Sequence, residues 1–145
     1  MTHKVEEITL STKAPSIENV FSKSALAMFD IVIDTSEVEL VTTKTVIIRS
    51  RDLKNLFYQF MKRVFDLANS ELFLLATVKQ LSIEQVGNEY LLNAILIGDK
   101  MNNNYNVKDI VKQVTDRNIS IREDRQGAMA QINLVVERRN VKDEV

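Results

Sequence analysis

Apolar residues recur every three or four positions in two stretches of the chain, and this spacing predicts two amphipathic helices. The first stretch follows Ser16, a natural N-cap, and runs from Ile17 until it ends at Thr35. The second follows Asp52, whose carboxylate caps the helix and suits the positive end of its dipole. We expect the apolar stripes of both helices to pack in the core.

The remaining apolar residues lie in β-branched or alternating runs, which predict strands. The expected strands are 5–11, 44–49, 72–80, 81–86, 90–97, 111–121 and 128–138. A turn at Gly87-Asn88 and a hairpin turn at Asp124–Gly127 connect neighbouring runs. Two helices packed against one mostly antiparallel sheet make an α+β fold. The 145 residues fit one domain, 1–145, in which we expect 1–3 and 140–145 to be flexible.

Composition removes several kinds of chemistry. The chain has no Cys and a single His, so thiol nucleophiles and a His-rich zinc site are excluded. Carboxylate oxygens remain as metal ligands, and they favour Mg²⁺, Mn²⁺ or Ca²⁺. The net charge of −1 gives no argument for nucleic acid or an anionic membrane as a partner. No apolar run approaches the length of a membrane span, so we expect a cytoplasmic protein.

Four motifs keep a characteristic order along the chain. The first helix contains Met28–Asp34 (MFDIVID), and the second helix opens with Asp52–Tyr58 (DLKNLFY). Gly98-Asp99 then follows a central strand, and after a loop comes Val111–Thr115 (VKQVT). This order resembles that of the archease family, the small accessory proteins of the RtcB-type RNA ligase. The chain looks like a divergent member of that family.

The resemblance implies a divalent metal ion held by two carboxylates, one on the first strand and one near the end of the last. The matching positions are Glu7, with Glu6 as its neighbour, and Glu137. To share one cation at ligand distances of about 2.0–2.6 Å, the two carboxylates must lie close together. The family's His-Thr-Ala before the first carboxylate is replaced here by Lys4-Val5-Glu6. The alternative is two solvated carboxylates at strand ends.

The VKQVT motif matches positions around the family's functional face. We therefore expect Lys112, Thr115 and the following Arg117 to face the partner or its nucleotide. Alternation along a strand places Lys112 and Val114 on one side and Thr115 on the other. The alternative is an exposed lysine and a threonine that merely favours a strand. The arginines of the hairpin are interleaved with acidic residues and lack aromatic neighbours, so we expect no direct nucleic-acid binding.

The resemblance implies a function for the whole chain. It would promote the GTP-dependent guanylylation and turnover of an RtcB-type RNA ligase in tRNA splicing, with GTP bound by the ligase and no enzymatic activity of its own. One alternative is a divergent member without the metal site, which acts as a protein-interaction or chaperone-like module. Another is an independent hydrolase, which requires Glu6, Glu7 or Glu137 in a concave pocket with raised proton affinity.

Overall fold

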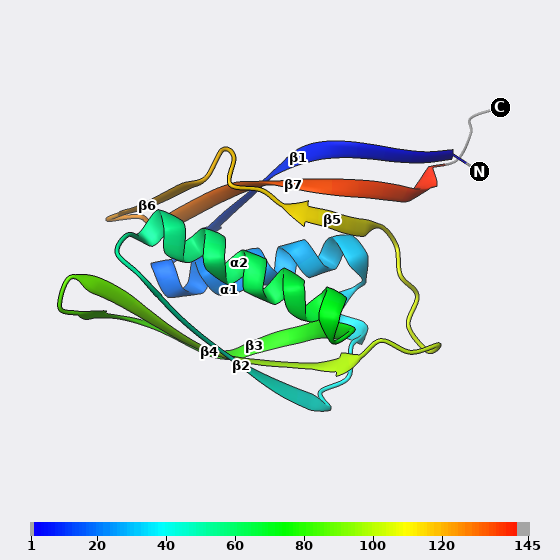
Figure 1. Ribbon diagram of the computed structural model, residues 1–145, viewed down its shortest axis with the longest axis horizontal. Coiled ribbons are helices and arrows are strands. Elements are labelled where there is room, and N and C mark those ends of the chain that lie inside the picture. The colour runs from blue at the N-terminus through cyan, green and yellow to red at the C-terminus, as the bar shows by residue number, and fades with distance from the viewer. Residues whose placement is uncertain (1, 142–145) are drawn as a thin grey trace.

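A computed structural model describes residues 2–141 of the chain and the side chains of residues 4–139. In this structure two α-helices lie between two antiparallel sheets (Figure 1). The elements in chain order are β1 (Thr2–Ala14), α1 (Ile17–Val32), the 3₁₀-helix η1 (Thr35–Glu37), β2 (Thr42–Ser50), α2 (Leu53–Ser70), β3 (Phe73–Val86), β4 (Glu89–Lys100), β5 (Ile110–Val114), β6 (Ser120–Asp124) and β7 (Gly127–Val141).

The predicted α+β class with antiparallel pairing is confirmed, but the strands form two sheets instead of one. One sheet has the order β1-β7-β5, with β6 also paired to β7, and the other has the order β2-β4-β3. Helix α1 contacts both β1 and β3, and α2 contacts both β2 and β5. Because the apolar surface of the helix pair is too broad for one sheet to cover, a sheet packs on each side of it.

The two helices begin where the sequence predicts. The Ser16 hydroxyl accepts a hydrogen bond from the Asn19 backbone N–H at 3.1 Å, and the Asp52 carboxylate accepts one from the Asn55 N–H at 2.7 Å. Between the helices, the fully buried rings of Phe21 in α1 and Phe57 in α2 pack with their centroids 5.1 Å apart. Within residues 2–141, neither α1 nor α2 combines the length and apolarity that a membrane span requires.

Several strand boundaries differ from those expected. Strand β1 is longer than 5–11 because it pairs with β7 from Thr2 to Ala14. The runs 72–80 and 81–86 form one bulged strand, β3, and the run 111–121 is divided into β5 and β6. Of the residues expected to be flexible, residue 1 and residues 142–145 lie outside the described part, whereas the backbone of 2–3 and 140–141 belongs to β1 and β7.

The Gly98-Asp99 pair has a packing role in the structure. A Cβ atom at Gly98 would lie 1.8 Å from the backbone oxygen of Leu74, so only glycine fits where β3 and β4 approach each other. The next residue, Asp99, accepts a hydrogen bond from the Tyr105 hydroxyl at 2.7 Å, and that hydroxyl oxygen accepts one from the Glu39 N–H at 3.0 Å. The pair thereby fixes the 101–109 segment against the chain that leads into β2.

Candidate functional site

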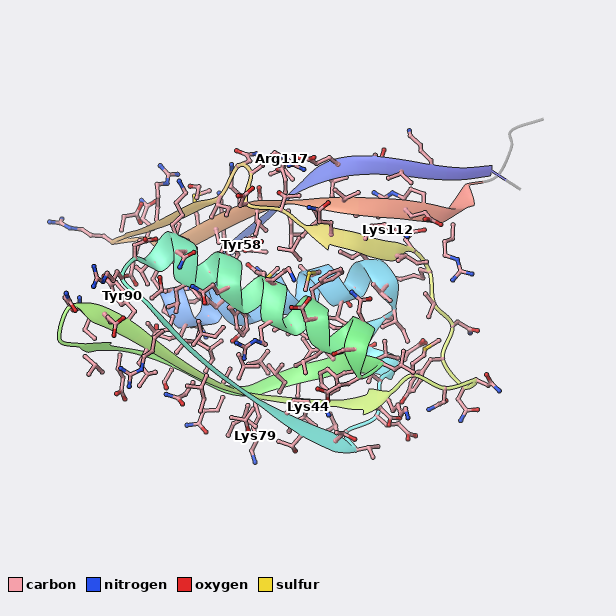
Figure 2. All side chains as sticks on the ribbon, viewed as in Figure 1. Lys44, Tyr58, Lys79, Tyr90, Lys112 and Arg117 are labelled. Atoms are coloured by element: carbon pink, nitrogen blue, oxygen red, sulfur yellow. The ribbon has the colours of Figure 1, made fainter. Side chains whose placement is uncertain are left out.

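The residues singled out from the sequence lie on and beside the β1-β7-β5 sheet. Along β7 the even-numbered residues from 128 to 136 are buried and point toward the helices, which defines the inner face of the sheet. The odd-numbered residues from 129 to 137 are half-buried and point to the outer face. Glu7 of β1 pairs with Val135, and Glu137 pairs with Val5, so both carboxylates belong to this outer face. Lys112 lies on β5, which pairs with β7, and Arg117 lies in the loop that follows β5 (Figure 2).

The Glu7 carboxylate is held by three hydrogen bonds. The Arg117 guanidinium donates through Nε to Oε2 at 3.0 Å and through Nη2 to Oε1 at 2.7 Å, and the Asn133 amide donates to Oε2 at 2.6 Å. The two parallel bonds from Arg117 match the fork geometry of a guanidinium–carboxylate pair. First Arg117 and then Asn133 lower the pKa of Glu7 from 4.5 to about 2. The same pairing raises the pKa of Arg117.

Glu137 is a diagonal neighbour of Glu7 across the two strands, which places their Cα atoms about 7–8 Å apart. The Glu7 carboxylate extends toward Asn133, which lies on the opposite diagonal, and therefore away from Glu137. Lys112 Nζ lies 3.7 Å from Glu137 Oε1. Each of the two expected metal ligands thus has a cationic side chain beside it.

In this arrangement the donors do not fit a shared divalent cation. Both oxygens of Glu7 accept hydrogen bonds from Arg117, and a cation between Glu7 and Glu137 would face the charges of Arg117 and Lys112. Among the described residues, no group of three or more Asp, Glu or His side chains gathers as a metal site. A cation can bind Glu7 only after Arg117 releases the carboxylate. The metal site at Glu7 and Glu137 stays a prediction.

Glu6 lies on the opposite face of the sheet from Glu7, because it pairs with the buried Val136. Arg138 Nε donates to Glu6 Oε2 at 3.1 Å, and Arg138 Nη1 donates to Asp109 Oδ2 at 3.0 Å. The bond from Arg138 holds the pKa of the Glu6 carboxyl below its ordinary value. Glu6 therefore ties β1 to β7 through Arg138, which also bonds Asp109 just before β5. The expectation that Glu6 accompanies Glu7 at one site is corrected.

The expected alternation along the VKQVT motif is wrong. A β-bulge between Val111 and Gln113 adds a residue, so Lys112 is exposed whereas Val114 is buried. Thr115 is only 1% exposed. Its hydroxyl donates to the Asn133 backbone oxygen at 2.9 Å and accepts from the Arg117 N–H at 3.1 Å. The expected partner-facing position of Thr115 is thus replaced by an internal one, from which it positions Arg117.

Four polar residues beside Glu7 were not identified from the sequence. Thr9, Asn118, Gln131 and Asn133 form a hydrogen-bonded group around the β5–β6 loop. Within it, the Thr9 hydroxyl donates to Asn133 Oδ1 at 2.7 Å, and Gln131 Nε2 donates to Asn118 Oδ1 at 2.8 Å. Asn is depleted in strands, so an asparagine in the middle of the predicted strand 128–138 could have marked Asn133 as a residue with a specific polar contact.

The geometry gives no support to an independent hydrolase. A cavity of about 270 Å³ lies between the ends of the helices, and a smaller one of about 150 Å³ lies beside the β6–β7 turn. Neither cavity is lined by Glu6, Glu7 or Glu137. The pKa values of Glu6 and Glu7 are lowered, whereas a general acid at neutral pH requires a raised one.

Comparison with known proteins matches this fold and sequence to one family. The Archease protein family (MTH1598/TM1083) matches residues 7–136. The protein archease of Methanosarcina barkeri is 27% identical over 120 residues, 79% of this chain and 80% of the relative. That of Methanothermobacter thermautotrophicus is 30% identical over 99 residues, 68% and 70% of the two chains.

A solved structure has the same fold. The solution structure of Methanobacterium thermoautotrophicum protein 1598 superposes with a TM-score of 0.77 at 23% identity. The match covers 91% of this chain and 96% of that protein. Because the family match spans nearly the whole described fold, the chain belongs to the archease family.

Proposed function

We propose that this chain is an accessory protein that promotes the GTP-dependent guanylylation and the turnover of an RtcB-type RNA ligase in tRNA splicing, in the cytoplasm. The ligase binds GTP and carries out the chemistry, and this chain is not itself the catalyst. The single observation that carries the proposal is the charged outer face of the β1-β7-β5 sheet. Glu7, Lys112, Arg117 and Glu137 converge there in a protein that belongs to the archease family.

The outer-face charges suit contact with a larger protein. The side chains of Arg117 and Lys112 are 55% and 50% exposed, so a partner surface can reach both. Arg117 is also held in place, since its guanidinium bonds Glu7 and its backbone N–H bonds the Thr115 hydroxyl. Charges fixed before binding guide the approach of a partner and lose little conformational freedom in the complex.

The test is guanylylation of a cognate ligase, measured with labelled GTP in a single turnover with Mg²⁺, Mn²⁺ or Ca²⁺. We expect the wild-type chain to increase the rate of guanylate formation. The variant Glu137→Gln removes one outer-face charge and is expected to reduce that increase. Glu84→Gln, an exposed carboxylate on the other sheet, is the matched control and should act as wild type. No acceleration by the wild-type chain with any of the three metals would contradict the proposal.

A second candidate is the family member without a metal site, which acts as a protein-interaction or chaperone-like module. The Glu7–Arg117 pair favours it, because the guanidinium supplies within the chain the positive charge that a metal ion would bring. Metal titration followed by the unfolding temperature separates the two, since a ligand that binds the folded state must stabilise it. A saturable increase in the wild-type Tm with any of the three metals would support the metal-binding version. If added metal raises the Tm of the Arg117→Met variant but not that of wild type, the metal-free candidate is supported.

A further inference from the structure

The larger cavity lies where the C-terminal ends of α1 and α2 meet the 101–111 segment. Its volume is about 270 Å³. Except for Asn69, every described residue that lines it is apolar, among them Met28 of α1, Phe65 of α2 and Met101. Among residues 4–139, whose side chains are described, no charged side chain lines the cavity, so these residues offer nothing to an ionic ligand.

The residue at the cavity's edge has an unusual backbone conformation. Leu72 follows the last turn of α2 with φ 55, in the left-handed region that glycine or asparagine normally occupies at the end of a helix. Its side chain lines the cavity and is nevertheless 49% exposed. The chain therefore keeps a large apolar side chain at a position where both the backbone conformation and contact with water disfavour it.

The lining is also suited to adapt to a ligand. Met28 and Met101 reach the cavity from different elements, and unbranched thioether side chains adjust readily to the shape of what they contact. Asn69 is exposed and supplies a polar amide group, which both donates and accepts hydrogen bonds. Apolar walls with one polar group are typical of sites for small, mostly apolar molecules.

We propose that this cavity binds a small uncharged molecule of about two-ring size, with its apolar body inside and one hydrogen-bonding group beside Asn69. An apolar cavity of about 150 Å³ accommodates benzene, so about 270 Å³ is enough for a bicyclic molecule. The proposal does not depend on the ligase proposal, because Glu7, Lys112, Arg117 and Glu137 do not line the cavity. The two sites approach each other at Ile110, which lines the cavity and pairs with Glu137 in the sheet.

Indole is the probe for a first test. The chain contains no Trp, so indole fluorescence is observed without interference from another indole group. We expect saturable binding with a blue-shifted emission. In a sample labelled at the methionine methyl groups, the NMR signals of Met28 and Met101 should shift, while those of Met61 and Met129, which do not line the cavity, should stay in place. Absence of saturation, or equal shifts of all four signals, would overturn the proposal.

Variants separate the cavity from general apolar surface. Ala68→Leu fills the cavity and is expected to weaken indole binding at least tenfold without lowering the Tm. Leu72→Asn introduces a residue that tolerates the left-handed backbone but removes the apolar side chain from the cavity. It should weaken indole binding several-fold. The control is Ile47→Thr, since Ile47 of β2 is 55% exposed but does not line the cavity. Binding that survives Ala68→Leu, or that Ile47→Thr weakens equally, would overturn the proposal.

The role of Asn69 has its own test. Naphthalene has the size of indole but lacks its N–H group. We expect Asn69→Ala to weaken indole binding several-fold and to leave naphthalene binding unchanged. Equal changes for the two molecules would contradict a hydrogen bond to Asn69.

Discussion

The two faces of the β1-β7-β5 sheet come from the same strands but depend on different interactions. The inner face consists of apolar residues such as Ile132 and Leu134, both with no exposed surface, that pack on the helices. The outer face depends on individual hydrogen bonds, of which the Glu7–Arg117 pair joins residues 110 positions apart in sequence. Packing tolerates many apolar residue types, whereas the outer face requires particular polar groups in a particular register. The fold and the candidate site can therefore change independently.

The largest expected effect tests this difference at two adjacent residues. Leu134→Ala leaves a void in the core and should lower the free energy of unfolding by about 2–5 kcal/mol. Val135→Ala, on the half-buried outer face, should lower it by less than about 1 kcal/mol. Urea denaturation of both variants measures the two values. Similar losses would show that the faces do not differ as described.

Thr115→Val is expected to have the next largest effect. Valine keeps the buried volume but removes the hydroxyl that bonds the Arg117 N–H and the Asn133 oxygen. The free energy of unfolding should fall by about 1–3 kcal/mol, because the partly buried Arg117 N–H loses its acceptor. Thr115→Ser keeps the hydroxyl and should preserve slow hydrogen exchange at the Arg117 amide. If Thr115→Val exchanges there as slowly as wild type, the assigned bond is wrong.

A smaller effect concerns Glu7 and pH. Its pKa is about 2 in the folded chain and 4.5 without its partners, so the folded state binds the proton less well. The stability that Glu7 contributes is fully present above pH 4.5 and is lost as the pH falls toward 2. Unfolding of wild type and Glu7→Gln should differ at pH 6, and the difference should shrink through this window. A difference that stays constant down to pH 2 would contradict the pairing.

Lys112→Met should have the smallest effect on stability. Its ion pair with Glu137 is 3.7 Å long and its side chain is 50% exposed, so the pair contributes about 0.2–1 kcal/mol at most. We expect an unfolding midpoint close to that of wild type, together with weaker stimulation of the ligase. Lys79→Met, an exposed lysine on β3, is the control that should change neither property (Figure 2).

The sequence predicted those parts of the fold that depend on short-range patterns. Ser16 and Asp52 cap the two helices as expected, and the 124–127 turn joins β6 to β7. The division into two sheets was not predicted, because strand periodicity shows which residues share a face but does not identify the sheet to which a strand belongs. The bulge that separates Lys112 from Val114 was not predicted either, because alternation assumes a regular strand.

The candidate site was predictable only in part. The positions of Glu7 and Glu137 came from the family resemblance, and the structure places both on one face. The Arg117 pairing did not follow from the sequence, since it depends on the loop that separates β5 from β6, where Asn118 has φ 57. A loop of this kind is specified by its tertiary contacts rather than by a repeating pattern.

The function is tested best by multiple-turnover RNA joining by a cognate RtcB-type ligase, with RNA in excess over ligase. We expect the wild-type chain to increase the number of turnovers per ligase. The double variant Lys112→Met/Glu137→Gln changes the outer face alone. It should lose most of this increase, while its unfolding midpoint stays within a few degrees of wild type. Unchanged turnover in the presence of wild type, or full stimulation by the double variant, would contradict the proposed function.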